Sequence, residues 1–253
     1  MAGTRSNLAI DGPSAAAHAP GSSVAVACGL AVSASSATKV HVRPGSRAGG
    51  PARDGWIGSI RVLYVYCHPL PESFHAAILK EALAGLKAAG HEVDLLDLYA
   101  EAFDPVLTEE ARRRYHDVPE NRAGLETYID RLTSAEAMVM QFPTWCFGMP
   151  AMLKGFCDRL MMPGVAFDLS DPAHVKPSLV NLRRIVGVVT YGRPWYMAKW
   201  MGDPPRKTVM RYLRWFTGGR ARAEYHALYH MNVATDAQRK AFIARVGAAM
   251  RKM

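Results

Sequence analysis

The feature that most constrains the fold is a regular alternation of strand-like and helix-like segments along the chain. Short runs rich in β-branched, aromatic and other apolar residues predict strands at 60–66, 92–98, 137–142, 184–190 and 223–229. Helical spacing of apolar residues predicts helices between Ser73 and Gly90 and at 108–116, 122–133, 150–160, 205–216 and 236–250. This order predicts an α/β fold, a doubly wound five-stranded parallel sheet with helices on both faces.

The first 57 residues have a different composition from the rest of the chain. They are rich in Ala, Ser, Gly and Arg, and Asp11 and Asp54 are their only acids. Such a sequence buries too little apolar surface to offset its ordering entropy. We therefore predict a disordered low-complexity extension over 1–57 and one folded domain over 58–253. Two alternative explanations of the extension are a transit peptide and a start codon assigned too early.

Charge is distributed unevenly along the domain. Residues 61–182 carry 11 Lys and Arg against 17 Asp and Glu, whereas residues 183–253 carry 15 against 3. The basic C-terminal part suits a dinucleotide phosphate, an anionic membrane surface or nucleic acid. No zinc-finger spacing or ribonucleoprotein-type aromatic motif is present, so we expect no nucleic-acid partner.

Cysteine spacing and hydropathy bear on metal binding, membrane insertion and the cellular compartment. The four cysteines form no C-x-x-C pair and no metal-type spacing with histidine, so we expect no metal site. Cys67, Cys146 and Cys157 are expected to be small apolar fillers in or beside the core. No run of about 18 apolar residues predicts a transmembrane helix. These features favour a protein of the reducing cytoplasm.

In a parallel sheet, ligands bind beyond the carboxyl ends of the strands. The loop after the first strand offers His68, Ser73 and the N–H groups of Phe74 and His75, which together suit a phosphate at a helix N-terminus. A capping serine beside an incidental histidine is the open alternative.

The loops after the third and fourth strands are rich in aromatic residues. Residues 141–150 include Pro143, Thr144, Trp145 and Phe147, and such exposed rings favour a planar cofactor. In the open alternative, Trp145 and Phe147 fold back into the core. The loop at 190–196 again joins small residues to aromatic ones, and its glycine permits close approach of a ligand.

Four motifs, taken in order, resemble the flavodoxin-like NAD(P)H quinone oxidoreductase family over about 60–230. They are V-Y-C-H-P-x-x-x-S-F, D-L-Y-A-E-x-F-D-P-V-L, Q-F-P-x-W-x-F-G-M-P-A-x-L-K-G and D-R-x-x-x-P-G-x-A-F. The resemblance implies a flavin, usually FAD and less often FMN. The residues it implies for flavin binding are His68, Ser73, Phe74, His75, Pro143, Thr144, Trp145, Phe147, Thr190, Tyr191, Gly192 and Arg193.

The resemblance also implies a homodimer whose active site is shared between subunits. Tyr196 falls near the family's active-site tyrosine, although the histidine often paired with that tyrosine has no clear counterpart here. His75 stands where the family commonly has asparagine, and Cys146 where it commonly has a second tryptophan. Phe103 and residues 158–167 match segments that in the family help to form the dimer interface and the substrate pocket.

The expected function is therefore two-electron transfer from NAD(P)H to a quinone or similar planar acceptor by a ping-pong hydride mechanism. A rival is a flavin-binding regulatory subunit of a potassium-efflux transporter, docking through the basic C-terminal face at the membrane. A one-electron flavodoxin-type carrier is another. Reduction of azo or nitro compounds differs from the expected function only in the acceptor.

Overall fold

The computed structural model describes residues 58–253. The extension predicted over 1–57, together with its alternatives, lies outside the described residues. Among the residues that are described, no helix combines the length and the apolarity needed to cross a bilayer.

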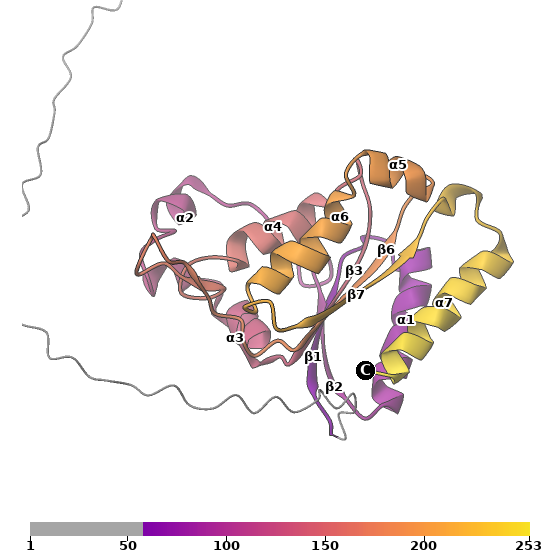
Figure 1. Ribbon diagram of the computed structural model, residues 1–253, viewed down its shortest axis with the longest axis horizontal. Helices are drawn as coiled ribbons and strands as arrows, with labels where there is room; N and C mark the ends of the chain where they lie inside the picture. The colour runs from indigo at the N-terminus through magenta and orange to yellow at the C-terminus, as the bar shows by residue number, and fades with distance from the viewer. Residues whose placement is uncertain (1–57) are drawn as a thin grey trace, which may run out of the picture. The chain divides into compact units, whose positions relative to one another are not determined.

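The centre of the fold is a parallel sheet of five strands in the order β2-β1-β3-β6-β7 (Figure 1). The strands are β1 (Arg61–Tyr66), β2 (Glu92–Asp97), β3 (Ala137–Pro143), β6 (Arg184–Thr190) and β7 (Arg222–Leu228). The predicted doubly wound fold is confirmed. Because the strand order reverses between β1 and β3, the carboxyl ends of these two strands form the switch point where such folds bind ligands.

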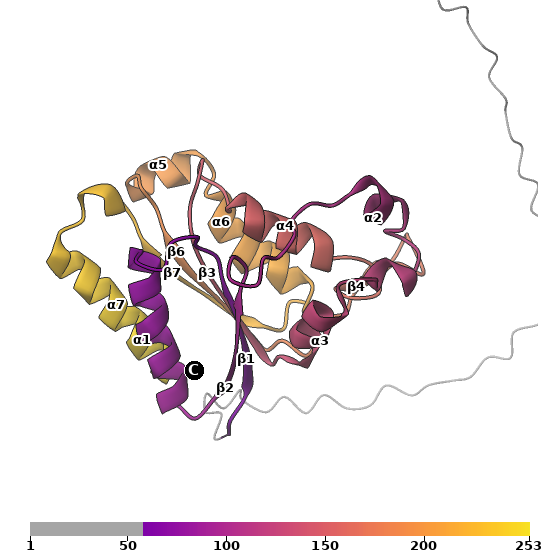
Figure 2. The same cartoon turned by 180° about the vertical axis from the view of Figure 1, so that it is seen from behind.

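Helices cover both faces of the sheet (Figures 1 and 2). The helices are α1 (Phe74–Ala88), α2 (Glu109–Arg113), α3 (Glu126–Ser134), α4 (Ala151–Leu160), α5 (Trp195–Trp200), α6 (Pro204–Lys207) and α7 (Asp236–Arg251). Side chains of β1 alternate between two cores: Val62 and Tyr64 face α1 and α7, whereas Leu63 and Val65 face α3 and α4. Both faces of the central strands are therefore buried.

Helices α1 and α7 lie side by side on one face and approach each other through glycine (Figures 1 and 2). A Cβ atom on Gly85 would lie 2.6 Å from the carbonyl oxygen of Gly247 and 2.9 Å from the Cβ of Met250. The absence of a side chain at Gly85 is thus what allows the two helices to pack so closely.

Three local features differ from the sequence-based expectation. Helix α5 and the two-residue strands β4 (Phe167–Asp168) and β5 (Lys176–Pro177) were not predicted. The helix predicted at 205–216 is α6 followed by a π-helical segment, η2 (Thr208–Leu213). The strand predicted at 137–142 extends one residue further, because Pro143 pairs with Thr190 as the last residue of β3, and the N–H of Thr144 donates to the carbonyl of Thr190.

Two short 3-10 helices complete the described structure. They are η1 (Glu120–Arg122) and η3 (Met231–Val233). Segment η3 follows β7 and leads into α7, which begins with a capping box between Thr235 and Gln238.

Candidate functional site

The loops after β1, β3 and β6 meet at the carboxyl edge of the sheet. The N–H of Cys67 donates to the carbonyl of Gln141 at 3.0 Å, and the N–H of Thr144 donates to the carbonyl of Thr190 at 2.8 Å. These backbone bonds hold the three loops against one another. The candidate site predicted from the sequence is therefore assembled from three separate parts of the chain.

The loop after β1 presents hydrogen-bond donors at the start of α1. Ser73 caps the helix by accepting from the N–H of Ala76 at 3.2 Å. The N–H groups of Phe74 and His75 lie in the first turn, where an α-helix supplies no internal acceptor. Together with the positive end of the helix dipole, they are suited to an anion.

His68 is a neutral donor beside this helix terminus. Its Nδ1 accepts from the N–H of Leu70 at 3.1 Å, which places the ring proton on Nε2. Burial lowers the pKa of His68 below its ordinary value, so the imidazole is uncharged near neutral pH. The ring stacks on His75 at 5.5 Å and lies 6.5 Å from the ring of Trp145. His68 thus joins the first loop to the second.

His75 belongs to a buried polar network beneath the loops. Its Nε2 lies 2.8 Å from Oγ1 of Thr190, and its Nδ1 lies 3.2 Å from Nε2 of Gln141. Gln141 also donates to the carbonyl of His75 at 2.6 Å and accepts from the hydroxyl of Tyr64 at 2.5 Å. Burial lowers the pKa of His75 to about 3. Its side chain is therefore a neutral internal strut, and a ligand contact from this residue would come from its backbone.

The loop after β3 is a tight turn that leaves one aromatic ring outside. Trp145 and Gly148 exchange two backbone hydrogen bonds, of 3.2 and 2.9 Å. Cys146 and Phe147 between them have φ values of 50° and 57°, a left-handed conformation that costs residues with a side chain on the order of 1 kcal/mol each. Trp145 is 43% exposed, whereas Phe147 packs partly against the core.

Of the two alternatives for these rings, exposure therefore holds for Trp145 and packing against the core holds for Phe147. Trp145 is available to a planar ligand, and Phe147 supports the turn from beneath. Pro143 is buried at the end of β3, and Thr144 is partly exposed beside it. Cys146 is exposed, so its prediction as a core filler was wrong, whereas Cys67 and Cys157 are buried as predicted.

The loop after β6 sends its first side chains inward. Thr190 joins the His75 network, and Tyr191 is buried, its ring stacked on Tyr229 at 4.5 Å. The Tyr191 hydroxyl donates to Oδ1 of Asp203 at 2.5 Å and lies 2.5 Å from the hydroxyl of Tyr225. Burial, followed by these neighbours, raises the pKa of Tyr191. Contacts from Thr190 and Tyr191 to a ligand would come from their backbones.

The following residues of this loop are accessible. A Cβ on Gly192 would lie 3.2 Å from Nδ2 of Asn232, so glycine permits the close approach of these two segments. The Arg193 side chain is exposed, and its carbonyl accepts from the N–H of His230 at 2.9 Å. Tyr196, on α5, is 59% exposed. Its side chain is therefore accessible from solvent.

Sequence reasoning missed two members of the site's support, Gln141 and Tyr64. A glutamine inside the apolar run 137–142 was the available signal, because a buried amide requires hydrogen-bond partners. Phe103, which matches an interface segment of the resembled family, is buried and packs against Tyr128 and Phe156 at 5.0 and 5.7 Å. Within residues 58–253, no three His, Cys, Asp or Glu side chains gather as a metal site.

The accessible residues form a set with defined chemistry. An exposed indole, a neutral imidazole N–H and the open N–H groups of a capped helix lie around one sheet edge. An apolar ring face suits a planar aromatic ligand, and unpaired N–H donors suit its phosphate. The residues present therefore fit a phosphate-bearing aromatic cofactor such as a flavin.

Comparisons with known proteins agree with this architecture. Ribosyldihydronicotinamide dehydrogenase [quinone] of Mus musculus is 34% identical over 149 residues, which cover 50% of this chain and 63% of that protein. NAD(P)H dehydrogenase [quinone] 1 of Cavia porcellus is 27% identical over 148 residues, 52% of this chain and 54% of that protein. The chain thus spans less than two-thirds of the length of these curated relatives.

Solved structures give the same result over a larger part of the chain. The crystal structure of Smu.1420 from Streptococcus mutans UA159 superposes with a TM-score of 0.67 at 30% identity, covering 77% of this chain and all of that one (100%). The NAD(P)H:quinone oxidoreductase from Methanothermobacter marburgensis shares the fold, with a TM-score of 0.63 at 24% identity, and covers 77% of this chain and 96% of that one. A family model described as Flavodoxin-like fold matches residues 60–250. The two curated relatives above are quinone dehydrogenases by name. Since the family match takes in nearly all of the described domain, the chain belongs to the flavodoxin-like family.

Proposed function

We propose that this protein is a flavin-dependent oxidoreductase that transfers two electrons from NAD(P)H to a quinone or a similar planar acceptor. The observation that carries the proposal is the meeting of His68 and exposed Trp145 at the β1–β3 switch point, beside the open N-terminus of α1. The names of the curated relatives support these classes of donor and acceptor.

The first loop would hold the cofactor's phosphates. The Nε2–H of His68 and the N–H groups of Phe74 and His75 would donate to phosphate oxygens, with Ser73 fixing the helix terminus. Trp145 would cover one face of the flavin ring, and the strained turn at Cys146 and Phe147 keeps this indole outside the core. A bound flavin supplies the hydride-accepting and hydride-donating chemistry.

The third loop would stabilise charge and move a proton. The backbone N–H of Gly192 and the exposed guanidinium of Arg193 would stabilise negative charge that develops during reduction. Tyr196 would donate a hydrogen bond or a proton from its exposed hydroxyl. Donor and acceptor would occupy this open face in turn, which gives ping-pong kinetics. If Tyr196→Phe turns over as fast as the parent chain, the Tyr196 hydroxyl does not donate this hydrogen bond or proton.

A cavity near the N-terminus of α1 supports FAD over FMN as the cofactor. A cavity of about 470 Å³ lies between the end of β7 and α7, with His230, Gln238, Phe242 and Arg245 in its wall. The ring of Phe74, in the first turn of α1, lies 6.4 Å from that of Phe242. If the N-terminus of α1 holds the cofactor's phosphates, this nearby cavity would take the adenosine group of FAD, which FMN lacks.

The isolated protein provides the direct test. The purified chain is expected to be yellow, to release FAD on denaturation with the mass of that cofactor, and to oxidise NAD(P)H when a quinone is added. Colourless protein that takes up neither FAD nor FMN on reconstitution would overturn the proposal. A bound flavin without quinone-dependent oxidation would favour the regulatory-subunit alternative, provided that a transporter partner binds the chain.

The proposal includes a homodimer in the cytoplasm. Trp200 at the end of α5, Tyr212 in η2 and Trp215 after it are exposed aromatic side chains of the kind that subunit interfaces bury. Cys67, Cys146 and Cys157 form no disulfide within the described residues, as expected of a protein of a reducing compartment.

A further inference from the structure

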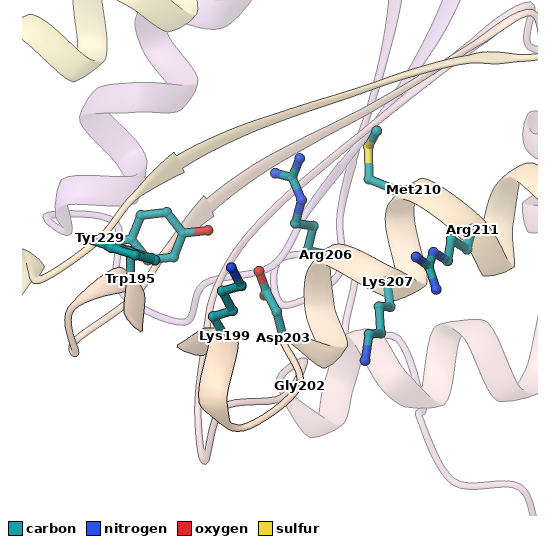
Figure 3. A pocket seen from close by; sticks show the side chains of 9 residues that line it. All are labelled: Trp195, Lys199, Gly202, Asp203, Arg206, Lys207, Met210, Arg211 and Tyr229. Carbon is teal, nitrogen blue, oxygen red and sulfur yellow. The ribbon is translucent and has the colours of Figure 1, made fainter. Parts of the chain in front are cut away.

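A strongly basic cavity lies directly beyond the third loop (Figure 3). Its volume is about 510 Å³, and its walls come from α5, the turn after it, the α6–η2 segment and the end of β7. Four cationic side chains, Lys199, Arg206, Lys207 and Arg211, line it, with Asp203 as the single acid. The formal excess is three positive charges.

These cations have few internal partners. No ion pair in the described part of the chain engages Lys199, Lys207 or Arg211. The Asp203 carboxylate accepts instead from the Tyr191 hydroxyl at 2.5 Å. The Arg206 guanidinium lies over the Tyr225 ring, 5.2 Å from its centroid. The one acid is thus hydrogen-bonded to Tyr191 and leaves an excess of three positive charges around the cavity, so the field there favours an anion.

The residues that line the cavity are connected to the third loop of the candidate site. Trp195, in its wall, follows Arg193 of the third loop by two residues. Tyr229, also in its wall, stacks on Tyr191 of that loop, and the N–H of His230 donates to the carbonyl of Arg193. A ligand whose reactive ring occupies the three-loop site could therefore place a distant anionic group among these cations.

We propose that this cavity binds phosphate groups of the nicotinamide dinucleotide that donates electrons, an inference that depends on the proposed function. The protein would then have two anion sites. The α1 N-terminus would bind the phosphates of the resident cofactor, and Lys199, Lys207 and Arg211 would bind those of the transient donor. The aromatic face of Trp195 adds a stacking surface for a nucleoside. The phosphate can be the pyrophosphate of any such donor or the 2′-phosphate of NADPH.

The test compares NADPH, NADH and dihydronicotinamide riboside as electron donors for the triple variant Lys199→Gln, Lys207→Gln, Arg211→Gln. The three donors differ in which phosphate groups they carry. All three side chains are exposed, so the fold is expected to persist. Arg206 is left unchanged because of its contact with Tyr225. We expect KM for the phosphate-bearing donor to rise about tenfold, while kcat/KM with dihydronicotinamide riboside, which carries no phosphate, stays within about twofold.

Each outcome decides the proposal. A rise confined to NADPH assigns the 2′-phosphate, and an equal rise with NADH assigns the pyrophosphate. No rise, or the same loss with the riboside, overturns the proposal. Lys87→Gln is the matched control, because it removes an exposed cation at the C-terminal end of α1, and it should change no KM.

Direct binding provides a readout that requires no turnover. Titration calorimetry with 2′-phospho-ADP-ribose, which carries both kinds of phosphate, is expected to give a Kd about tenfold weaker for the triple variant than for the parent and the Lys87→Gln control. Equal Kd values would overturn the proposal. If the parent oxidises no donor, the proposed function fails, whereas a charge-dependent Kd still establishes the phosphate site.

Discussion

His75 and Trp145 occupy neighbouring loops but opposite environments. The sequence placed both among the contacts of one ligand, yet His75 is 2% exposed and Trp145 43% exposed. Residue type does not reveal this difference, because the groups that bind the His75 ring lie 66 and 115 residues away in the chain. Only the register of β3 against β1, and of β6 against β3, brings Gln141 and Thr190 beneath the helix terminus.

Burial of His75 gives the fold an acid-dependent stability. An unfolded histidine gains its proton near pH 6.5, whereas folded His75 does so only near pH 3, so the unfolded state binds more protons between these values. The free energy of unfolding should therefore decrease as pH falls through this window, by up to about 1.4 kcal/mol per pH unit. In His75→Gln the decrease should be smaller. Urea unfolding at pH 7, 6 and 5 measures both slopes.

The matched control is His116→Gln, which replaces an exposed histidine in the segment after α2. Its slope should equal that of the parent chain. A His75→Gln slope that is also unchanged would show that this imidazole is not the group that titrates.

Trp145 is the side chain on which the proposed flavin stacking most depends. Trp145→Ala removes an aromatic contact worth about 0.5–1.5 kcal/mol and should weaken flavin affinity roughly threefold to tenfold. Trp145→Phe keeps a ring face and should stay within about twofold of the parent. Fluorescence titration of flavin-free protein measures the three dissociation constants, and equal values for the Ala variant and the parent would contradict the stacking role.

Among the elements, the contact between α1 and α7 is the most sensitive to volume. A side chain on Gly85 would meet the backbone of Gly247, so Gly85→Val should lower the free energy of unfolding by about 1–3 kcal/mol. Ala84→Val is the control, because it creates the same residue at an exposed position of the same helix. Urea denaturation midpoints compare the two, and equal midpoints would mean that α7 shifts without cost.

Elements with a strong periodic signal were predicted, and those held mainly by tertiary contacts were not. All five strands of the main sheet were identified, because β-branched runs of strand length contrast with their helical neighbours. Helix α5 is six residues long, and β4 and β5 are two residues each, which is too short for a period to emerge. The π-helical geometry of η2 likewise leaves no mark in the sequence, since it depends on how a turn is packed.

At the scale of the whole molecule, exposed tryptophans lead us to expect self-association. Trp200 is 82% exposed, and Trp215 is 45% exposed in the helical turn after η2. If this surface forms the proposed dimer, Trp200→Ser with Trp215→Ser should weaken association at least tenfold, as expected for buried aromatic anchors. Light scattering after gel filtration should then show the mass fall from twice 27.7 kDa toward 27.7 kDa.

Val180→Ser is the control for this experiment. It removes an apolar side chain that is 55% exposed on the segment before β6. The dimer should survive that change, and a dimer that also survives the double tryptophan substitution must use another surface.

The tight turn after β3 also provides a built-in reporter of the site. Its apex holds the exposed thiol of Cys146 next to Trp145, whereas burial raises the pKa of both Cys67 and Cys157 to about 12 and leaves them unreactive. A thiol-reactive dye should therefore label the parent chain at one position more than Cys146→Ser. Saturating flavin should slow that reaction. The turn thereby allows occupancy to be followed in real time by a covalent probe, at the residue next to the indole that would carry the cofactor.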